Sequence, residues 1–87
     1  MSMSKGDWSA TEVDSVIVAA DENVDEVRIQ VLSGGPIWIA FGEAAVAGKG
    51  LFVAQNGSYM VDDHRARMDI HAICGAGQVA AGGYQSA

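Results

Sequence analysis

The strongest constraint on the fold is a strict alternation of apolar and polar residues over a short segment. Val27, Ile29 and Val31 alternate with Arg28 and Gln30. This is the period of a strand that buries one face and leaves the other in water. The pattern therefore predicts a half-buried β-strand.

The segment that follows alternates in the same way, but both of its faces are apolar. After a Gly-Gly-Pro break, Ile37, Ile39 and Phe41 alternate with Trp38 and Ala40. Gly and Pro together are strong chain breakers, so a second strand begins here. Its Trp38 face needs a cover, which is either another layer of the same domain or a neighbouring molecule.

Short strands separated by turn residues account for most of the chain. Further strand-like segments are 13–20, 51–55, 58–61, 68–74 and 77–81. The Asn56-Gly57 pair predicts a type I′ hairpin turn, and Glu43–Ala47 is too short to sustain a helix, so we expect a loop or a single turn. About seven short strands predict an all-β fold, a compact antiparallel β-sandwich or jelly-roll-like barrel.

The 87-residue length leaves room for one domain. Residues 1–12 are mostly polar and unpatterned, which predicts an extended N-terminal arm ahead of a single β-sandwich domain at 13–87. Trp8 is unusual in such an arm. It packs either onto its own domain or onto another chain, because a tryptophan needs an apolar socket.

The charge is acidic and unevenly distributed. Eleven acidic and five basic residues give a net charge of −6, which disfavours direct nucleic-acid binding. Residues 7–26 contain no Lys or Arg; their acidic residues are Asp7, Glu12, Asp14, Asp21, Glu22, Asp25 and Glu26. This run is either a solvated face or a docking surface for a basic partner.

Cysteine content and hydropathy bound the cellular context. A single cysteine rules out an internal disulfide and a CxxC metal site. The first residues lack the apolar core of a signal peptide, and no apolar run reaches the roughly 18 residues of a membrane helix. We therefore expect synthesis in the cytoplasm and no membrane partner.

The motifs that suggest catalysis each have a structural alternative. Gly75–Ala80 matches G-x-G-x-x-A, but too few residues follow to complete a dinucleotide-binding unit. Residues His71 and Cys74 fall on opposite faces of a strand, so Cys74 is expected to be a buried structural thiol. His64, His71 and the nearby aspartates lack a metal-ligand spacing. We expect no catalytic, cofactor-binding or metal-binding residues.

Interface candidates are therefore the main functional prediction from the residues themselves. They are the aromatic residues Trp8, Trp38 and Tyr84 and the acidic residues Asp21, Glu22, Asp25 and Glu26. Tryptophan is a favoured anchor at protein interfaces. For Trp38, burial beneath the second layer of its own sandwich remains the alternative.

Two stretches resemble small virion proteins of tailed phages. Residues 27–42 read V-R-I-Q-V-L-S-G-G-P-I-W-I-A-F-G, and residues 70–79 read I-H-A-I-C-G-A-G-Q-V. Both are similar to a pattern in capsid decoration (cement) proteins, with Tyr59–Val61 between them. The chain departs from that pattern at Asp62–Arg65, where the similar proteins often carry prolines and glycine.

The resemblance implies a non-enzymatic virion protein with a β-sandwich or jelly-roll fold. Such a protein would decorate the outer capsid surface as a homotrimer, bridge adjacent major capsid proteins through its arms, and need no cofactor. Other virion components remain alternatives: a head-completion, tail or fibre protein. A small carbohydrate- or ligand-binding β-module using Trp38 or Tyr84, and a cupin-like metal enzyme using His64 and His71, are further alternatives.

Overall fold

Eight strands form two four-stranded antiparallel sheets in a computed structural model that describes residues 4–87. The strands are β1 (Ser4–Ala10), β2 (Ser15–Val18), β3 (Val27–Gly34), β4 (Ile37–Phe41), β5 (Leu51–Val53), β6 (Ser58–Val61), β7 (Ile70–Cys74) and β8 (Ala80–Ser86). A single 3₁₀ turn, η1 (His64–Arg67), lies between β6 and β7. The predicted all-β sandwich is confirmed, with eight strands instead of about seven.

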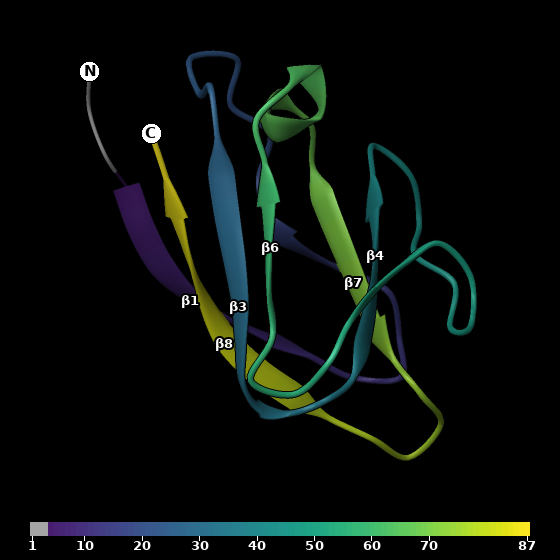
Figure 1. Cartoon of the computed structure of the whole chain (residues 1–87). Helices are drawn as coiled ribbons and strands as arrows, with labels where there is room; N and C mark the ends of the chain where they lie inside the picture. Colours follow the sequence, from purple (N-terminus) through teal and green to yellow (C-terminus); the bar gives the residue numbers. More distant parts are fainter. Residues whose placement is uncertain (1–3) are drawn as a thin grey trace.

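The strand order is that of a jelly roll. One sheet, here called sheet A, has the order β1-β8-β3-β6, and the other, sheet B, has the order β2-β7-β4-β5. Each strand of the first half pairs with its counterpart counted from the end of the chain: β1 with β8, β2 with β7, β3 with β6 and β4 with β5. This is a long antiparallel ribbon rolled into two layers. Figure 1 shows the strands of sheet A side by side, with β4 and β7 in the other layer.

The core lies between the sheets and follows the alternation seen in the sequence. Val27, Ile29 and Val31 of β3 are buried, while Arg28 and Gln30 are exposed. Sheet B contributes its own inward-facing residues, and the largest fully buried side chains are Ile29, Ile37, Ile70, Val27, Val31, Val61 and Cys74. Burial of this kind is worth roughly 1.5–3 kcal/mol for each large aliphatic side chain.

The N-terminal segment differs from the predicted arm. Residues 4–10 form β1, which pairs with β8 along its whole length, from Ser4 opposite Ser86 to Ala10 opposite Ala80. Trp8 is 6% exposed, and its Nε1–H donates to the Gly83 carbonyl oxygen at 3.0 Å. The tryptophan thus packs onto its own domain and contributes to the core, which makes β1 part of the sandwich. Residues 1–3 of the predicted arm lie outside the described residues.

The hairpin predicted at Asn56-Gly57 is wrong. Strand β5 belongs to sheet B and β6 to sheet A, so the chain crosses from one layer to the other between them. The crossing is held by β3: the Asn56 amide donates to the Val31 carbonyl at 2.9 Å, and the Val31 amide donates to the Gly57 carbonyl at 3.0 Å. Only Asn56 of the pair has a positive φ, 64°, whereas a type I′ turn needs two.

Two other loop predictions are confirmed. Residues Glu43–Ala47 form a loop without a helix, and residues 75–78 form a turn between β7 and β8 in place of a nucleotide-binding helix. Within residues 4–87 no helix is long and apolar enough to cross a membrane.

Candidate functional site

The outer face of sheet B is an apolar surface on a small protein. The register places Ile73, Trp38 and Phe52 in one row across β7, β4 and β5. A second row, Val16, His71 and Ala40, crosses β2, β7 and β4. These six residues are called the outer sheet-B face below. Five of them are apolar, which distinguishes this face from an ordinary solvated sheet surface.

Exposure and ring geometry show that this face is only partly open in the single chain, because four of its six residues are half-buried. Phe52 is 56% exposed and Val16 is 48% exposed. The Trp38 and Phe52 rings pack edge to face with centroids 5.6 Å apart. Trp38 points away from sheet A, because its neighbours Ile37 and Ile39 are the buried ones. The second layer of the domain therefore does not cover Trp38, and only partial shielding by adjacent side chains remains.

The one polar member of the face, His71, is held by a carboxylate. Its Nδ1 lies 3.1 Å from Asp14 Oδ2, and Asp14 Oδ1 accepts a 2.7 Å hydrogen bond from the Ala45 amide. Burial of the Asp14 carboxyl raises its pKa, but the Ala45 amide and His71 together outweigh that effect and leave the pKa below its ordinary value. This contact, called the Asp14 latch, ties the β4–β5 loop to the start of β2, and Ala45 is 4% exposed beneath it.

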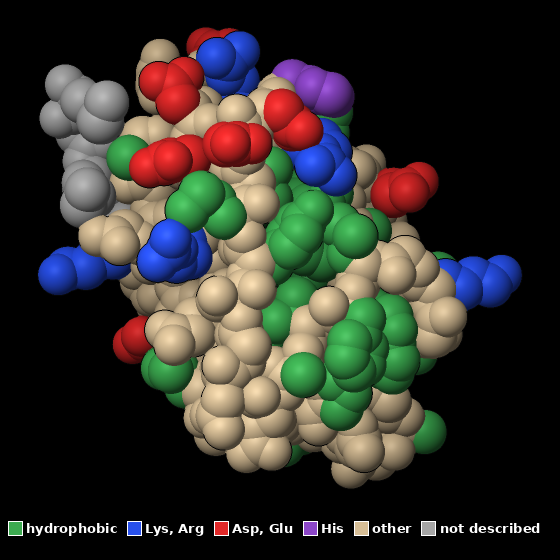
Figure 2. All heavy atoms as spheres, in the orientation of Figure 1, with side chains coloured by type: hydrophobic (Ala, Val, Ile, Leu, Met, Phe, Trp, Pro, Cys, Tyr) green, Lys and Arg blue, Asp and Glu red, His purple; other side chains and the backbone are tan. Residues whose placement is uncertain are grey.

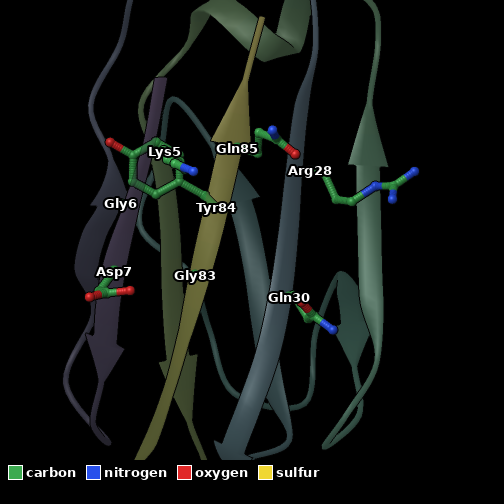
Figure 3. A pocket seen from close by; sticks show the side chains of 8 residues that line it. All are labelled: Lys5, Gly6, Asp7, Arg28, Gln30, Gly83, Tyr84 and Gln85. Atoms are coloured by element: carbon green, nitrogen blue, oxygen red, sulfur yellow. The ribbon is translucent and has the colours of Figure 1, made fainter. Parts of the chain in front are cut away.

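The outer face of sheet A carries a shallow groove with a mostly polar lining. The groove is about 540 Å³ and is lined by Lys5, Gly6, Asp7, Arg28, Gln30, Gly83, Tyr84 and Gln85. Its floor is Gly83, which pairs with Asp7 on β1 and Gln30 on β3. In Figure 3 the Arg28 side chain extends toward β6, while Asp7 points away from it on β1, so the charged groups do not converge on one point. This is not the arrangement of a catalytic site.

Tyr84, an interface candidate, lies above Gly6 and packs against the core. A Cβ atom on Gly6 would be 2.8 Å from Tyr84 Cε1, so the absence of a side chain at Gly6 makes room for the ring. Tyr84 is only partly buried. The Tyr84 ring therefore contributes to the packing against the core.

The four acidic interface candidates lie together in the β2–β3 connection. Asp21, Glu22, Asp25 and Glu26 are all exposed. Two of them hold the loop in place: Asp21 Oδ1 accepts from the Asn23 amide within the loop at 2.9 Å, and Asp25 Oδ1 accepts from Arg67 Nη2 of η1 at 3.3 Å. Figure 2 shows acidic side chains gathered at one end of the molecule and hydrophobic ones lower on the same view. Exposed pairs of this kind contribute at most about 1 kcal/mol.

The thiol and the two histidines are separated by the fold. Cys74 is 1% exposed and faces the core, and burial raises the pKa of its thiol. His71 lies on the opposite face of β7, as the strand period predicted, and His64 is exposed in η1. In the described part of the chain no three His, Cys, Asp or Glu side chains are placed to hold a metal ion.

Sequence reasoning identified Trp38 but missed its companions on the outer sheet-B face. Phe52 was assigned to a hairpin strand, and the three consecutive apolar residues Leu51–Val53 gave no signal for which side chain faces outward. Val16 and Ile73 had no distinguishing signal, because a single exposed aliphatic residue is common. The Asp14 latch joins residues 14, 45 and 71, which no local pattern relates.

Comparison with known proteins adds one result on the fold. No described protein family and no curated protein matches this sequence. A solved structure reported for Bacillus endospore appendages, which form a family of disulfide-linked pili, has a TM-score of 0.62 and 24% sequence identity. The match covers 98% of this chain and 80% of that chain. The two proteins share a fold.

Proposed function

We propose that this chain is a non-enzymatic structural subunit that assembles with copies of itself. The observation that carries the proposal is the jelly-roll fold, shared along 98% of the chain with a protein that forms pili. An assembly of identical subunits needs a rigid unit with surfaces left for its neighbours. Here a rolled two-layer sandwich supplies the rigid unit, and its edge strands β1, β6, β2 and β5 retain free hydrogen-bonding sides that neighbours can cover.

The chemistry of the described side chains supports a structural role. The polar contacts found within residues 4–87 serve the fold itself: Asp14 holds a loop, Asp63 caps η1 through the Arg65 amide at 2.9 Å, and Asp69 accepts from the Ala20 amide at 2.7 Å. No nucleophile faces a base across a cleft among these residues. Burial of Cys74 also removes the chain's one thiol from chemistry at the surface.

The assembly proposed here is noncovalent. Disulfide-linked pili need accessible cysteines on both sides of a contact, and the lone cysteine of this chain is 1% exposed. Copies of this chain are therefore joined by packing and hydrogen bonds. Reducing agents should leave the assembly intact.

Light scattering and negative-stain electron microscopy of the purified full chain test the proposal. We expect particles larger than a single chain that grow with protein concentration and persist in a thiol reductant. A Cys74→Ser variant should assemble to the same extent as the parent chain. A monodisperse monomer at every concentration, with no particles on the grid, would contradict a self-assembling subunit.

A second candidate is the decoration of a phage capsid as a trimer that bridges major capsid proteins on the outer virion surface. The observation that favours it is the group of four exposed acidic residues, Asp21, Glu22, Asp25 and Glu26, in the β2–β3 connection of an acidic protein. Acidic ends suit a surface that faces away from packaged DNA. Under this candidate the isolated chain stops at a trimer, near 27 kDa from three chains of 9.0 kDa, and binds preformed capsid shells. Open-ended growth without shells would favour the polymer.

A further inference from the structure

We infer that the outer sheet-B face is a contact surface for the same face of a second copy of this chain. The inference deepens the proposed function, on which it rests, by naming one of the contacts in the assembly. Two rows of side chains make the surface, Ile73–Trp38–Phe52 and Val16–His71–Ala40. The occupant is a second copy for two reasons, charge and shape.

The first reason is charge. Each chain carries a net charge of −6, so contacts between copies must keep carboxylates apart. The outer sheet-B face contains no acidic or basic side chain other than His71, and the carboxylate nearest to it, Asp14, is already engaged by His71 and the Ala45 amide. Four exposed acidic residues lie elsewhere, in the β2–β3 connection. Two copies meet here without bringing like charges together, whereas a basic partner would find no complementary charge.

The second reason is shape. Packed β-sheets stack face to face about 10 Å apart, with side chains of the two surfaces interdigitating. A second copy presents a four-stranded sheet of the same width and twist. The two surfaces therefore match in size, because the two chains are identical. A two-fold arrangement places the Trp38–Phe52 pair of one copy on the apolar row of the other, and such contacts are self-complementary. Aromatic side chains at the centre of the patch are typical interface anchors.

The size of the surface indicates how strong the contact is. Four strands about 4.8 Å apart and three to five residues long outline a face of less than roughly 300 Å². Both copies together fall short of the roughly 1,200 Å² buried in stable specific complexes. A face of this size forms weak pairs in dilute solution and becomes effective when many copies are held together. This is the behaviour expected of one contact among several in an assembly.

A groove of mixed character adjoins the face. It is about 580 Å³, is reached from Ala40, and is lined by Phe41, Val46 and Met68 as well as by the charged residues Glu43, Lys49 and Arg65. Val46 is 52% exposed. The β4–β5 loop that carries Val46 is fixed by the Asp14 latch, so this rim is held in place beside the face.

Sedimentation velocity over a wide concentration range tests the inference, with a matched pair of variants. Phe52→Ser removes an aromatic ring that is 56% exposed on sheet B, and Leu32→Ser removes an aliphatic side chain that is 57% exposed on sheet A. Both positions are exposed, so both variants should stay folded, which circular dichroism and urea unfolding will check. We expect Phe52→Ser to weaken self-association at least tenfold and Leu32→Ser to leave it unchanged. Equal association by the two variants would overturn the inference.

A cross-link reports the geometry directly. Ala40 lies on β4, a central strand of sheet B, so Ala40→Cys places a thiol near the middle of the face. Mild oxidation should link two copies through Cys at this position, whereas Leu32→Cys should give no dimer. Absence of the Ala40→Cys dimer at concentrations where the parent chain associates would show that copies meet elsewhere. A parent chain that is monomeric throughout would also overturn the inference and would leave the face to another molecule.

The outcomes separate this contact from the proposed function. If Phe52→Ser forms the same large particles as the parent chain, the contact is wrong and the structural role stands. If the parent chain forms only the face-to-face pair and nothing larger, the contact stands and the polymer is wrong.

Discussion

The two outer faces of the sandwich differ although both sheets have four antiparallel strands. The difference begins at the central strands, whose outward residues are small in sheet A and include a tryptophan in sheet B. Strand β8 of sheet A places Ala81 and Gly83 outward, which leaves a groove with polar residues on the neighbouring strands. Strand β4 of sheet B places Trp38 outward, with Ala40 beside it. Inside, both sheets are apolar. The outer face of sheet B is the one that we propose as a contact between copies.

Substitution of the two tryptophans should give the largest difference in stability between a core position and a position on an outer face. Trp8→Ala empties a core position that is 6% exposed, so we expect a loss of about 3–5 kcal/mol in the free energy of unfolding. Trp38→Ala should cost about 1 kcal/mol, because its ring lies on an outer face. Its main effect should be weaker self-association. Urea unfolding and sedimentation measure the two quantities separately, and similar unfolding losses for both variants would show that Trp38 belongs to the core.

Two adjacent glycines of β8 sharpen the contrast between the inside and the outside of sheet A. A Cβ atom on Gly82 would lie 2.6 Å from Trp8 Cζ2 and would also strike the Gln30 carbonyl oxygen, whereas on Gly83 the nearest atom is the Gly6 carbonyl oxygen at 3.3 Å. We expect Gly82→Ala to cost about 3 kcal/mol and Gly83→Ala to stay within about 1 kcal/mol. Thermal unfolding of the pair checks this. Equal shifts in Tm would mean that the Trp8 side of β8 tolerates a methyl group.

The Asp14 latch should make the rim of sheet B sensitive to acid. The pKa of Asp14 is lowered in the folded chain, so its contribution is present above the ordinary pKa of 3.8 and is lost as pH falls through the folded value. Asp14→Ala should cost about 1 kcal/mol at neutral pH through the lost hydrogen bonds. Unfolding measured from pH 7 to pH 2 should show a shallower acid dependence in this variant. A slope identical to that of the parent chain would assign the acid sensitivity to other carboxylates.

The smallest effects are expected on the outer face of sheet A. Lys5 and Arg28 line its groove and are exposed. Replacing either with alanine should change the free energy of unfolding by less than about 0.5 kcal/mol and should leave self-association unaltered. Weaker self-association in either variant would give the polar groove a place in the assembly and would remove the contrast between the two faces.

Local patterns in the chain were sufficient to predict most of the strands and the class of fold. The alternation at 27–31 predicted which side chains of β3 are buried, and the period of β7 separated His71 from Cys74 correctly. The two apolar faces of 37–41 indicated that Trp38 needs a cover. The predictions for β3 and β7 succeed because side-chain direction along a strand depends only on sequence position.

Predictions failed where a segment's partner lies far away in the chain. Residues 4–10 look like an arm, because their apolar partner surface is supplied by β8, more than seventy residues later. Residues 51–61 look like a hairpin, because the local turn signal does not reveal the backbone hydrogen bonds that Asn56 and Gly57 make with β3.

By itself the sequence determined that this chain is all β and which residues point inward along its most clearly alternating strands. It also determined that one strand is apolar on both of its faces. Only the tertiary structure decided that β1 is part of the sandwich, that β5 and β6 lie in different layers, and that Trp38, Phe52, Ile73 and Val16 share one surface. The physical reason is that backbone propensity and side-chain period are local, whereas strand pairing is chosen by the burial of surfaces that meet only when the ribbon rolls up.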